Sequence, residues 1–205
     1  MIISESSESF DRVAEVIKAG GIIAFRTDTL YGLGADPFNA SAVQKIKQLK
    51  GRKGHKPILV VISERAHVAR LLTRQTNSFE HLSRKFWPGA LTIIGEAAGD
   101  VPDELTAGTK TLGVRLPDDG RVRALVEACG GALTATSANP ANELPARSAL
   151  DVEQYFGDAV DLIVDGGAAK TDQPSTVVDA TTEQVMLIRE GAVPWAQIET
   201  GLRSS

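Results

Sequence analysis

Three polar segments stand beside apolar runs in this chain and have residue types that could do chemistry. The first, Arg26 to Gly34, places threonine hydroxyls, a carboxylate and two glycines after a predicted buried strand. A plain turn in which Asp28 and the threonines satisfy backbone groups would use the same residues. Ligands of open α/β sheets bind outside the strand ends, however, so this segment is also a candidate binding site.

The second segment is basic and runs from Lys50 to Pro57. It packs the cations Lys50, Arg52, Lys53 and Lys56 and two glycines into eight residues. Flexible backbone combined with lysine and arginine suits the binding of phosphate or carboxylate groups. A solvated charged loop is the alternative interpretation of the same run.

The third segment, Thr134 to Pro140, ends an apolar run with Ser137 and Asn139. A hydroxyl and an amide there could hold a carbonyl or phosphate oxygen, although a turn that ends a strand explains them as well. A nucleophilic role for Ser137 is disfavoured, because the chain lacks the G-x-S-x-G elbow and has no histidine nearby in sequence. Further polar candidates are Arg115, Ser175 and Arg189.

Several familiar patterns are missing from the sequence. It contains no G-x-x-x-x-G-K-[ST] loop, no complete dinucleotide fingerprint, no H-E-x-x-H and no paired cysteines. The histidines His55, His67 and His81 lie far apart in sequence. The sequence therefore predicts no metal-ligand set.

The elements that must position these segments alternate between helix and strand. Apolar spacing predicts helices from Ser9 or Ser7 to Lys18 and over 40–49, 64–72, 78–86, 120–128, 150–156 and 194–200. Strands are expected at 22–26, 57–62, 90–95, 113–116, 132–136, 162–164, 176–179 and 184–188, and residues 27–37 are expected to be a loop. Such alternation indicates an α/β fold, and the last two strands are close enough to pair antiparallel, which predicts a mixed sheet.

Composition narrows the class of protein. The 205 residues predict a single domain over 1–205, and 42% hydrophobic with 23% charged residues is typical of a globular chain. Apolar runs are too short for a membrane span, the N-terminus does not resemble a signal peptide, and the one cysteine fits a reducing cytoplasm. A net charge of −4 disfavours a protein whose main role is to coat nucleic acid.

Taken in order, these segments resemble the YrdC/Sua5/TsaC family of threonylcarbamoyl-AMP synthases, over about residues 10–195. The matching motifs are Thr27-Asp28-Thr29-Leu30-Tyr31-Gly32-Leu33, Lys50-x-Arg52 with Lys56-Pro57, Trp87-Pro88-Gly89, Val114-Arg115-Leu116-Pro117, Thr136-Ser137-Ala138-Asn139, and Pro174-Ser175-Thr176-Val177-Val178-Asp179 followed by Ile188-Arg189-Glu190-Gly191. The chain departs from the family pattern where Arg26, Lys53 and Ala90 replace prolines, and after Asn139, where x-Ser-Gly is missing. It resembles the short form, without the C-terminal domain of longer Sua5-type members.

The resemblance implies a fold and a reaction. The fold would be a single YrdC-like domain, with a twisted mixed parallel and antiparallel sheet flanked by helices and a concave ligand-binding face. The enzyme would be a cytoplasmic nucleotidyltransferase that converts L-threonine, bicarbonate and ATP to threonylcarbamoyl-AMP and pyrophosphate. This is the first step in forming tRNA N6-threonylcarbamoyladenosine (t6A37). A downstream threonylcarbamoyl-transferase complex would use the product, tRNA contact is open, and no membrane partner is implied.

The resemblance also assigns roles to residues. Lys50, Arg52, Ser137 and Asn139 would be catalytic and bind the nucleotide phosphates, and Ser175 and Arg189 would hold the nucleotide on the opposite wall. Threonine would contact Thr29, Tyr31, Lys56 and Arg115. Mg²⁺ would arrive on the triphosphate with few protein ligands. Catalysis would be mainly positioning and electrostatics, and alanine at Lys50 or Arg52 is expected to abolish turnover with the fold intact.

Two other functions use the same fold. One is an RNA-binding module without enzymatic activity, for which a steeply salt-dependent RNA affinity would be the evidence. The other is a paralogue that makes a carbamoyl-adenylate from a different amine, like the related domain of hydrogenase maturation carbamoyltransferases. Amine specificity separates this second function from threonylcarbamoyl-AMP synthesis.

Overall fold

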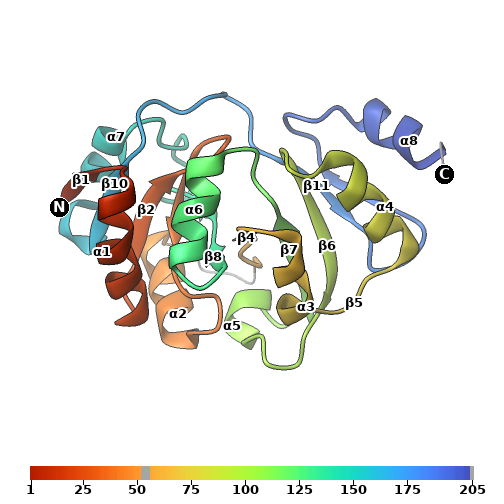
Figure 1. Ribbon diagram of the computed structural model, residues 1–205, viewed down its shortest axis with the longest axis horizontal. Helices are drawn as coiled ribbons and strands as arrows, with labels where there is room; N and C mark the ends of the chain where they lie inside the picture. The colour runs from red at the N-terminus through yellow and green to blue at the C-terminus, as the bar shows by residue number, and fades with distance from the viewer. Residues whose placement is uncertain (52–55, 204–205) are drawn as a thin grey trace.

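The computed structural model describes residues 1–51 and 56–203 of the chain. These residues form two β-sheets that lie side by side with helices around them (Figure 1). The first sheet has the order β1-β10-β2-β3-β9, formed by β1 (Ile2–Ser4), β10 (Leu162–Asp165), β2 (Ile23–Arg26), β3 (Tyr31–Gly34) and β9 (Thr136–Ser137). Its first three strands run parallel, and β2, β3 and β9 pair antiparallel.

The second sheet has the order β12-β11-β6-β7-β4-β8, with β5 paired to β6. Its strands are β4 (Val60–Ile62), β5 (Leu72–Arg74), β6 (Leu91–Ala97), β7 (Thr111–Arg115), β8 (Ala132–Thr134), β11 (Thr176–Asp179) and β12 (Met186–Arg189). The pairs β6–β11 and β4–β7 are parallel, whereas β11–β12, β6–β7 and β4–β8 are antiparallel. The predicted mixture of strand directions and the antiparallel final pair are confirmed, but the sequence pattern did not predict the division into two sheets.

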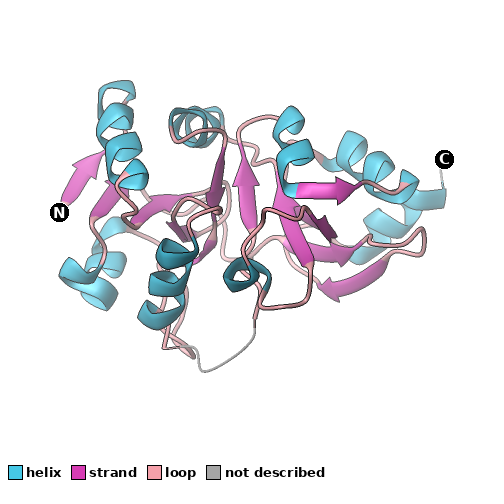
Figure 2. Ribbon diagram, turned by 90° about the horizontal axis from the view of Figure 1, so that it is seen from below, coloured by secondary structure: helices cyan, strands magenta, loops and turns pink. Residues whose placement is uncertain are grey.

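The helices cover the outer faces of the sheets, as the views in Figures 1 and 2 show. They are α1 (Ser7–Lys18), α2 (Ala40–Leu49), α3 (Val68–Leu71), α4 (Asn77–Phe86), α5 (Asp103–Thr106), α6 (Gly120–Ala128), α7 (Ala149–Phe156) and α8 (Trp195–Arg203), with 3₁₀ turns η1 (Arg65–His67) and η2 (Gly157–Ala159). Side chains cap several N-termini; Ser6, not Ser7 or Ser9, caps α1 by accepting from the Ser9 N–H. In this described part of the chain, none of the helices has both the length and the apolar content that a membrane crossing requires.

Strand β3 corrects the prediction that residues 27–37 are a loop. Its glycines reduced the strand signal, yet the close packing around β3 requires a glycine at position 34. A Cβ on Gly34 would lie 2.8 Å from the Phe25 ring, and one on Gly32 would lie 3.4 Å from the carbonyl oxygen of Thr136. Glycine here allows neighbouring backbone and side chains to approach closely. The short elements β1, β5 and α5 were also not predicted.

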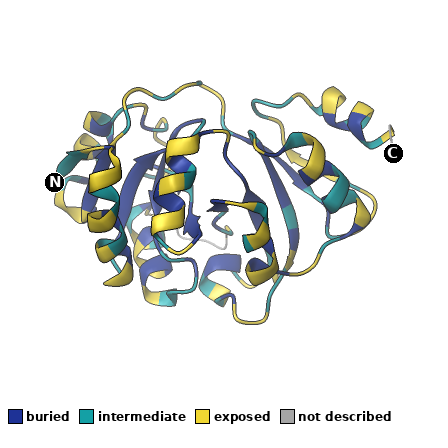
Figure 3. Cartoon of the chain, in the orientation of Figure 1, coloured by how far each residue is buried: buried dark blue, intermediate teal, exposed yellow. Residues whose placement is uncertain are grey.

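The two sheets share a hydrophobic core. One cluster of buried residues contains Phe25 from β2, Val61 from β4, Val122 from α6 and Leu133 from β8, so it spans both sheets. Figure 3 shows the buried residues concentrated on the strands and on the inner faces of the helices. Residues 166–175 connect β10 of the first sheet to β11 of the second, along the top of the view in Figure 1. We refer to residues 166–175 as the connector.

Candidate functional site

The turn between β2 and β3, Thr27 to Leu30, is tightly hydrogen-bonded through its threonines. Thr27 Oγ1 donates to the Leu30 carbonyl oxygen at 2.8 Å, accepts from the Thr29 N–H at 3.1 Å, and lies 3.0 Å from Thr29 Oγ1. Thr27 and Thr29 are buried. The predicted substrate residue Thr29 therefore sits in a fixed turn at the end of the first sheet, because the Thr27 hydroxyl satisfies the turn's own backbone groups.

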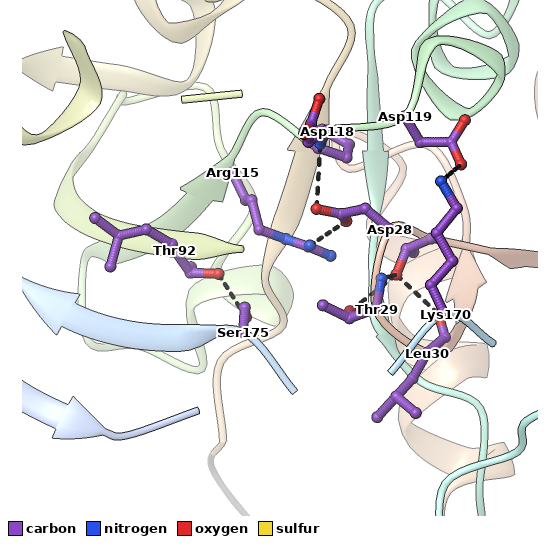
Figure 4. Close-up of polar contacts among 12 residues, drawn as sticks. Asp28, Thr29, Leu30, Thr92, Arg115, Asp118, Asp119, Lys170 and Ser175 are labelled. Carbon is purple, nitrogen blue, oxygen red and sulfur yellow. Dashed lines mark hydrogen bonds and ion pairs between the residues drawn. The ribbon is translucent and has the colours of Figure 1, made fainter. Parts of the chain in front are cut away.

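Arg115, at the end of β7, reaches this turn from the second sheet. Its Nη1 forms an ion pair with Asp28 Oδ1, and the side chains are only 7% and 6% exposed. The other Asp28 oxygen accepts from the Asp118 N–H at 3.1 Å (Figure 4). The structure thus brings the predicted residues Thr29 and Arg115 to one place. It also adds Asp28, which the sequence offered only as part of the Thr-Asp-Thr motif.

Tyr31 follows the turn and is fully buried. Its hydroxyl donates to the Gly167 carbonyl oxygen at 2.7 Å and lies 3.3 Å from Asp165 Oδ1. Burial, reinforced by the Asp165 charge, raises the pKa of Tyr31 above its ordinary value of 10.0. The tyrosine ring therefore attaches the connector to β3, and its predicted contact with threonine stays a prediction.

Lys50, Ser137 and Asn139 form a second polar group. Lys50 lies at the end of α2, is 1% exposed, and donates through Nζ to the Ser137 carbonyl oxygen, to the Asn139 carbonyl oxygen at 2.8 Å and to Asn139 Oδ1 at 3.2 Å. Ser137 Oγ donates to Asn139 Oδ1 at 2.6 Å. Gly32 of β3 pairs with Ser137, which places this group one strand away from β2. The three predicted residues meet, and Lys50 binds the loop itself.

Ser175 directly precedes β11, and Arg189 is the last residue of β12. Because the two strands pair antiparallel, these residues lie at the same end of the pair. Arg189 Nη2 donates to the Ser175 carbonyl oxygen at 2.8 Å, and Ser175 Oγ lies 2.9 Å from Thr92 Oγ1. Partial burial of the guanidinium and repulsion from the charge of Arg115 lower the pKa of Arg189. The positive charges of Arg115 and Arg189 therefore act on each other.

The structure leaves the predicted roles of two further residues untested. Lys56 is exposed, and Arg52 lies outside the described residues, so both roles stay predictions. The segment around Trp87 packs into the core, with a buried ring whose Nε1 donates to the Leu91 carbonyl oxygen at 2.7 Å. Thr92, in that same segment, was missed as a neighbour of Ser175, because a hydroxyl inside an apolar run gives no signal of its own.

The arrangement is suited to binding anions. It offers a buried guanidinium group on Arg115 and one on the exposed residue Arg189, together with hydroxyls on Thr29 and Ser175 and an amide on Asn139. Planar guanidinium groups bind carboxylate and phosphate in a fork geometry. Among residues 1–51 and 56–203, no group of three or more His, Cys, Asp or Glu side chains is placed to hold a metal ion.

Comparison with known proteins relates this site to a family. Residues 15–191 match the Sua5/YciO/YrdC family, which is described as "Telomere recombination". The chain belongs to the Sua5/YciO/YrdC family. A relative from Marinobacter nauticus, named threonylcarbamoyl-AMP synthase, is 37% identical over 183 residues, which is 87% of this chain and 96% of the relative. A relative of the same name from Pyrococcus abyssi is 33% identical over 91% of this chain but 55% of its own length.

Solved structures of Sua5/YciO/YrdC proteins agree with this fold. The crystal structure of P. abyssi Sua5 complexed with L-threonine superposes with a TM-score of 0.94 at 31% identity, covering 98% of this chain and 60% of that one. E. coli YciO superposes with a TM-score of 0.85 over 97% of this chain and 98% of its own, at 24% identity, which supports the fold alone. Length therefore varies widely in this family around a shared architecture.

Proposed function

We propose that the chain is a threonylcarbamoyl-AMP synthase, which converts L-threonine, bicarbonate and ATP to threonylcarbamoyl-AMP and pyrophosphate. The observation that carries the proposal is the 37% identity over 96% of the Marinobacter relative of that name. The threonine complex of the similar P. abyssi protein supports threonine as the amino-acid substrate. Residues 1–205 would act as one catalytic domain.

The site chemistry is compatible with this reaction. A threonyl carbamate and the α-phosphate of ATP are both anionic, so the site must cancel their repulsion and hold them in line. Arg115 would bind the threonine carboxylate beside Thr29, and Arg189 and Ser175 would bind the nucleotide. Arg115 and Arg189 influence each other electrostatically, which supports placing the two substrates next to one another.

The role of Lys50 differs from the direct phosphate binding that a lysine in this motif suggests. Its Nζ holds the Ser137 and Asn139 backbone and the Asn139 amide. We propose that Lys50 fixes the direction of the Ser137 hydroxyl and the Asn139 amide toward the phosphates. Arg52 and Lys56 would supply positive charge to the phosphates and to threonine, respectively.

ATP would bring Mg²⁺ with it, and the metal would neutralise phosphate charge when bound. We further propose a cytoplasmic protein whose product passes to a threonylcarbamoyl-transferase complex in the t6A pathway of tRNA modification, with or without direct tRNA contact.

The test is pyrophosphate release from ATP, with threonine and bicarbonate each omitted in turn. Release should require all three substrates. Arg189→Gln should lower kcat/KM for ATP about tenfold to a hundredfold, because a charge-assisted contact to the nucleotide is lost. Arg84→Gln, which removes an exposed guanidinium on α4 that pairs with Glu80, is the matched control and should leave kcat/KM unchanged.

Other outcomes of the test point to the alternatives. Release with a different amine, and none with threonine, would indicate a paralogue that makes another carbamoyl-adenylate. Absence of ATP binding, together with RNA affinity that falls steeply with salt, would indicate an RNA-binding module instead. Either outcome would refute the proposed function.

A further inference from the structure

The β2–β3 turn of the first sheet is attached at two points to the junction between β7 and α6. One point is Asp28, which binds Arg115 and the Asp118 N–H. The other is Arg26, the last residue of β2, whose Nη2 lies 3.2 Å from Asp119 Oδ2. Arg26 and Asp28 therefore flank Thr27 and bind consecutive residues of the junction.

The attachment through Arg26 is strong because this residue lies in a buried ionic group. It is 7% exposed, pairs with Asp119 and lies 3.7 Å from Glu5, and the connector residue Lys170 binds Asp119 at 2.9 Å (Figure 4). A Cβ on Gly166 would lie 2.8 Å from Arg26 Nε, so a glycine is needed beside this side chain. The group contains two cations and two carboxylates, which balance in charge. It fixes the base of the turn without drawing on Asp28.

Asp28 is therefore left to act on Arg115. Both of its carboxylate oxygens are engaged, one with Arg115 and one with the Asp118 N–H. An acid with both oxygens held in this way is poorly placed to move a proton. Arginine has five N–H donors in a rigid fork, so a guanidinium held by Asp28 through Nη1 presents its remaining donors in a defined direction. Figure 4 shows the Arg115 side chain extended toward Asp28.

We propose that Asp28 is a positioning residue, which orients the Arg115 guanidinium across the junction of the two sheets so that it binds the carboxylate of the amino-acid substrate. This inference rests on the proposed function and adds a residue to it. Without Asp28, Arg115 would lose its partner while the positive Arg189 remained close by, so the guanidinium would turn away from the place where threonine binds.

If Asp28 acts only through its negative charge, its removal changes the KM for threonine in the opposite direction from that expected if Asp28 orients Arg115. The proposal can therefore be tested. If Asp28 acted only as a negative charge beside the site, removing it would make the site more positive and would lower the KM for threonine. If Asp28 orients Arg115, Asp28→Asn should raise the KM for threonine about tenfold to a hundredfold. The KM for ATP should stay within about twofold, because Ser175 and Arg189 are attached independently of Asp28.

The experiment is steady-state pyrophosphate release by the full chain, measured for wild type, Asp28→Asn, Arg115→Met and the double variant. If Asp28 acts through Arg115, the double variant should have the threonine KM of Arg115→Met alone. Asp103→Asn is the matched control, because Asp103 forms a close ion pair with Lys110 at the surface, and it should change neither KM. Circular dichroism and a urea titration on each variant establish that it is folded.

The outcomes separate the two proposals. Threonine-dependent release by wild type with an unchanged or lowered threonine KM in Asp28→Asn would overturn the positioning role and leave the proposed function standing. Equal and independent effects of Asp28→Asn in the wild-type and Arg115→Met backgrounds would also overturn it. If wild type releases no pyrophosphate with threonine, the proposed function fails and this inference fails with it.

Discussion

Lys50→Met tests whether the buried lysine holds the Ser137–Asn139 loop. Methionine keeps most of the length of the side chain but removes the ammonium group. The Ser137 carbonyl oxygen, the Ser137 hydroxyl, the Asn139 carbonyl oxygen and Asn139 Oδ1 then lose the ammonium donor. The Ser137 carbonyl oxygen still accepts from the Asn139 N–H, and Asn139 Oδ1 still accepts from the Ser137 hydroxyl. A hydrogen bond to a charged group contributes about 1.5–3 kcal/mol, and such values do not simply add.

The expected loss of unfolding free energy is therefore about 1–3 kcal/mol, the cost of leaving a buried neutral acceptor such as the Asn139 carbonyl oxygen without its donor. A loss of this size is a large part of the roughly 5–15 kcal/mol that stabilises a typical domain.

The assay is urea unfolding followed by tryptophan fluorescence and far-UV circular dichroism, with pyrophosphate release measured on the same samples. Lys45→Met is the matched control, because this exposed lysine on the same helix has only a 3.4 Å contact with the Gly20 carbonyl oxygen and should change stability by less than about 0.5 kcal/mol. A loss below about 1 kcal/mol in Lys50→Met, with an unchanged denaturant slope, would refute the structural role and return Lys50 to direct phosphate binding.

Two further substitutions follow from contacts beside the site. Tyr31→Phe removes the 2.7 Å hydrogen bond to Gly167 and should cost about 1 kcal/mol in a urea titration. Because the folded state raises the pKa of Tyr31 above 10.0, wild type should lose stability as pH rises above 10, and the variant should lose less over the same range; equal slopes would contradict this. Gly191→Ala would put a Cβ 2.2 Å from the Pro174 carbonyl oxygen, so it should displace Ser175, cost about 1–3 kcal/mol and raise the KM for ATP. Gly99→Ala, with no atom within 4 Å of the added Cβ, is its control. Similar stabilities for the two variants would show that the backbone at Pro174 moves away from residue 191 at little cost in free energy.

The sequence predicted most helices and strands because their apolar spacing is regular. Helix α6 was predicted with its observed bounds, since the capping residue Asp119 marks its start. Strand β11 was also predicted with its observed bounds, since polar residues flank it. Strand β3 was missed because Gly32 and Gly34 suppress the strand signal, and only the packing of Phe25 and Thr136 reveals why glycine stands there. Very short elements such as β1 carry too few residues to show a period.

Site residues were predictable where a motif contains them and unpredictable where the fold alone brings them together. Ser137 and Asn139 were identified from their place at the end of an apolar run, and they do meet Lys50. The Asp28–Arg115 pair joins residues 87 positions apart on different sheets, and no local pattern indicates such a contact. The sequence marked Arg26 only as a replacement for a proline. Its partners Glu5 and Asp119 precede and follow β2 in the sequence, so no local pattern connects them.

The place of β10 in the first sheet has a consequence for how the chain is made. Leu162–Asp165 inserts between β1 and β2, so Ile2–Ser4 and Ile23–Arg26 have no strand between them until residue 165 has left the ribosome. At about 5–20 residues per second, that interval is on the order of ten seconds. During that time the nascent chain carries unpaired apolar strand edges, which are the features that chaperones bind and that lead to aggregation. The rate of synthesis between residues 26 and 165 should therefore affect the yield of native protein.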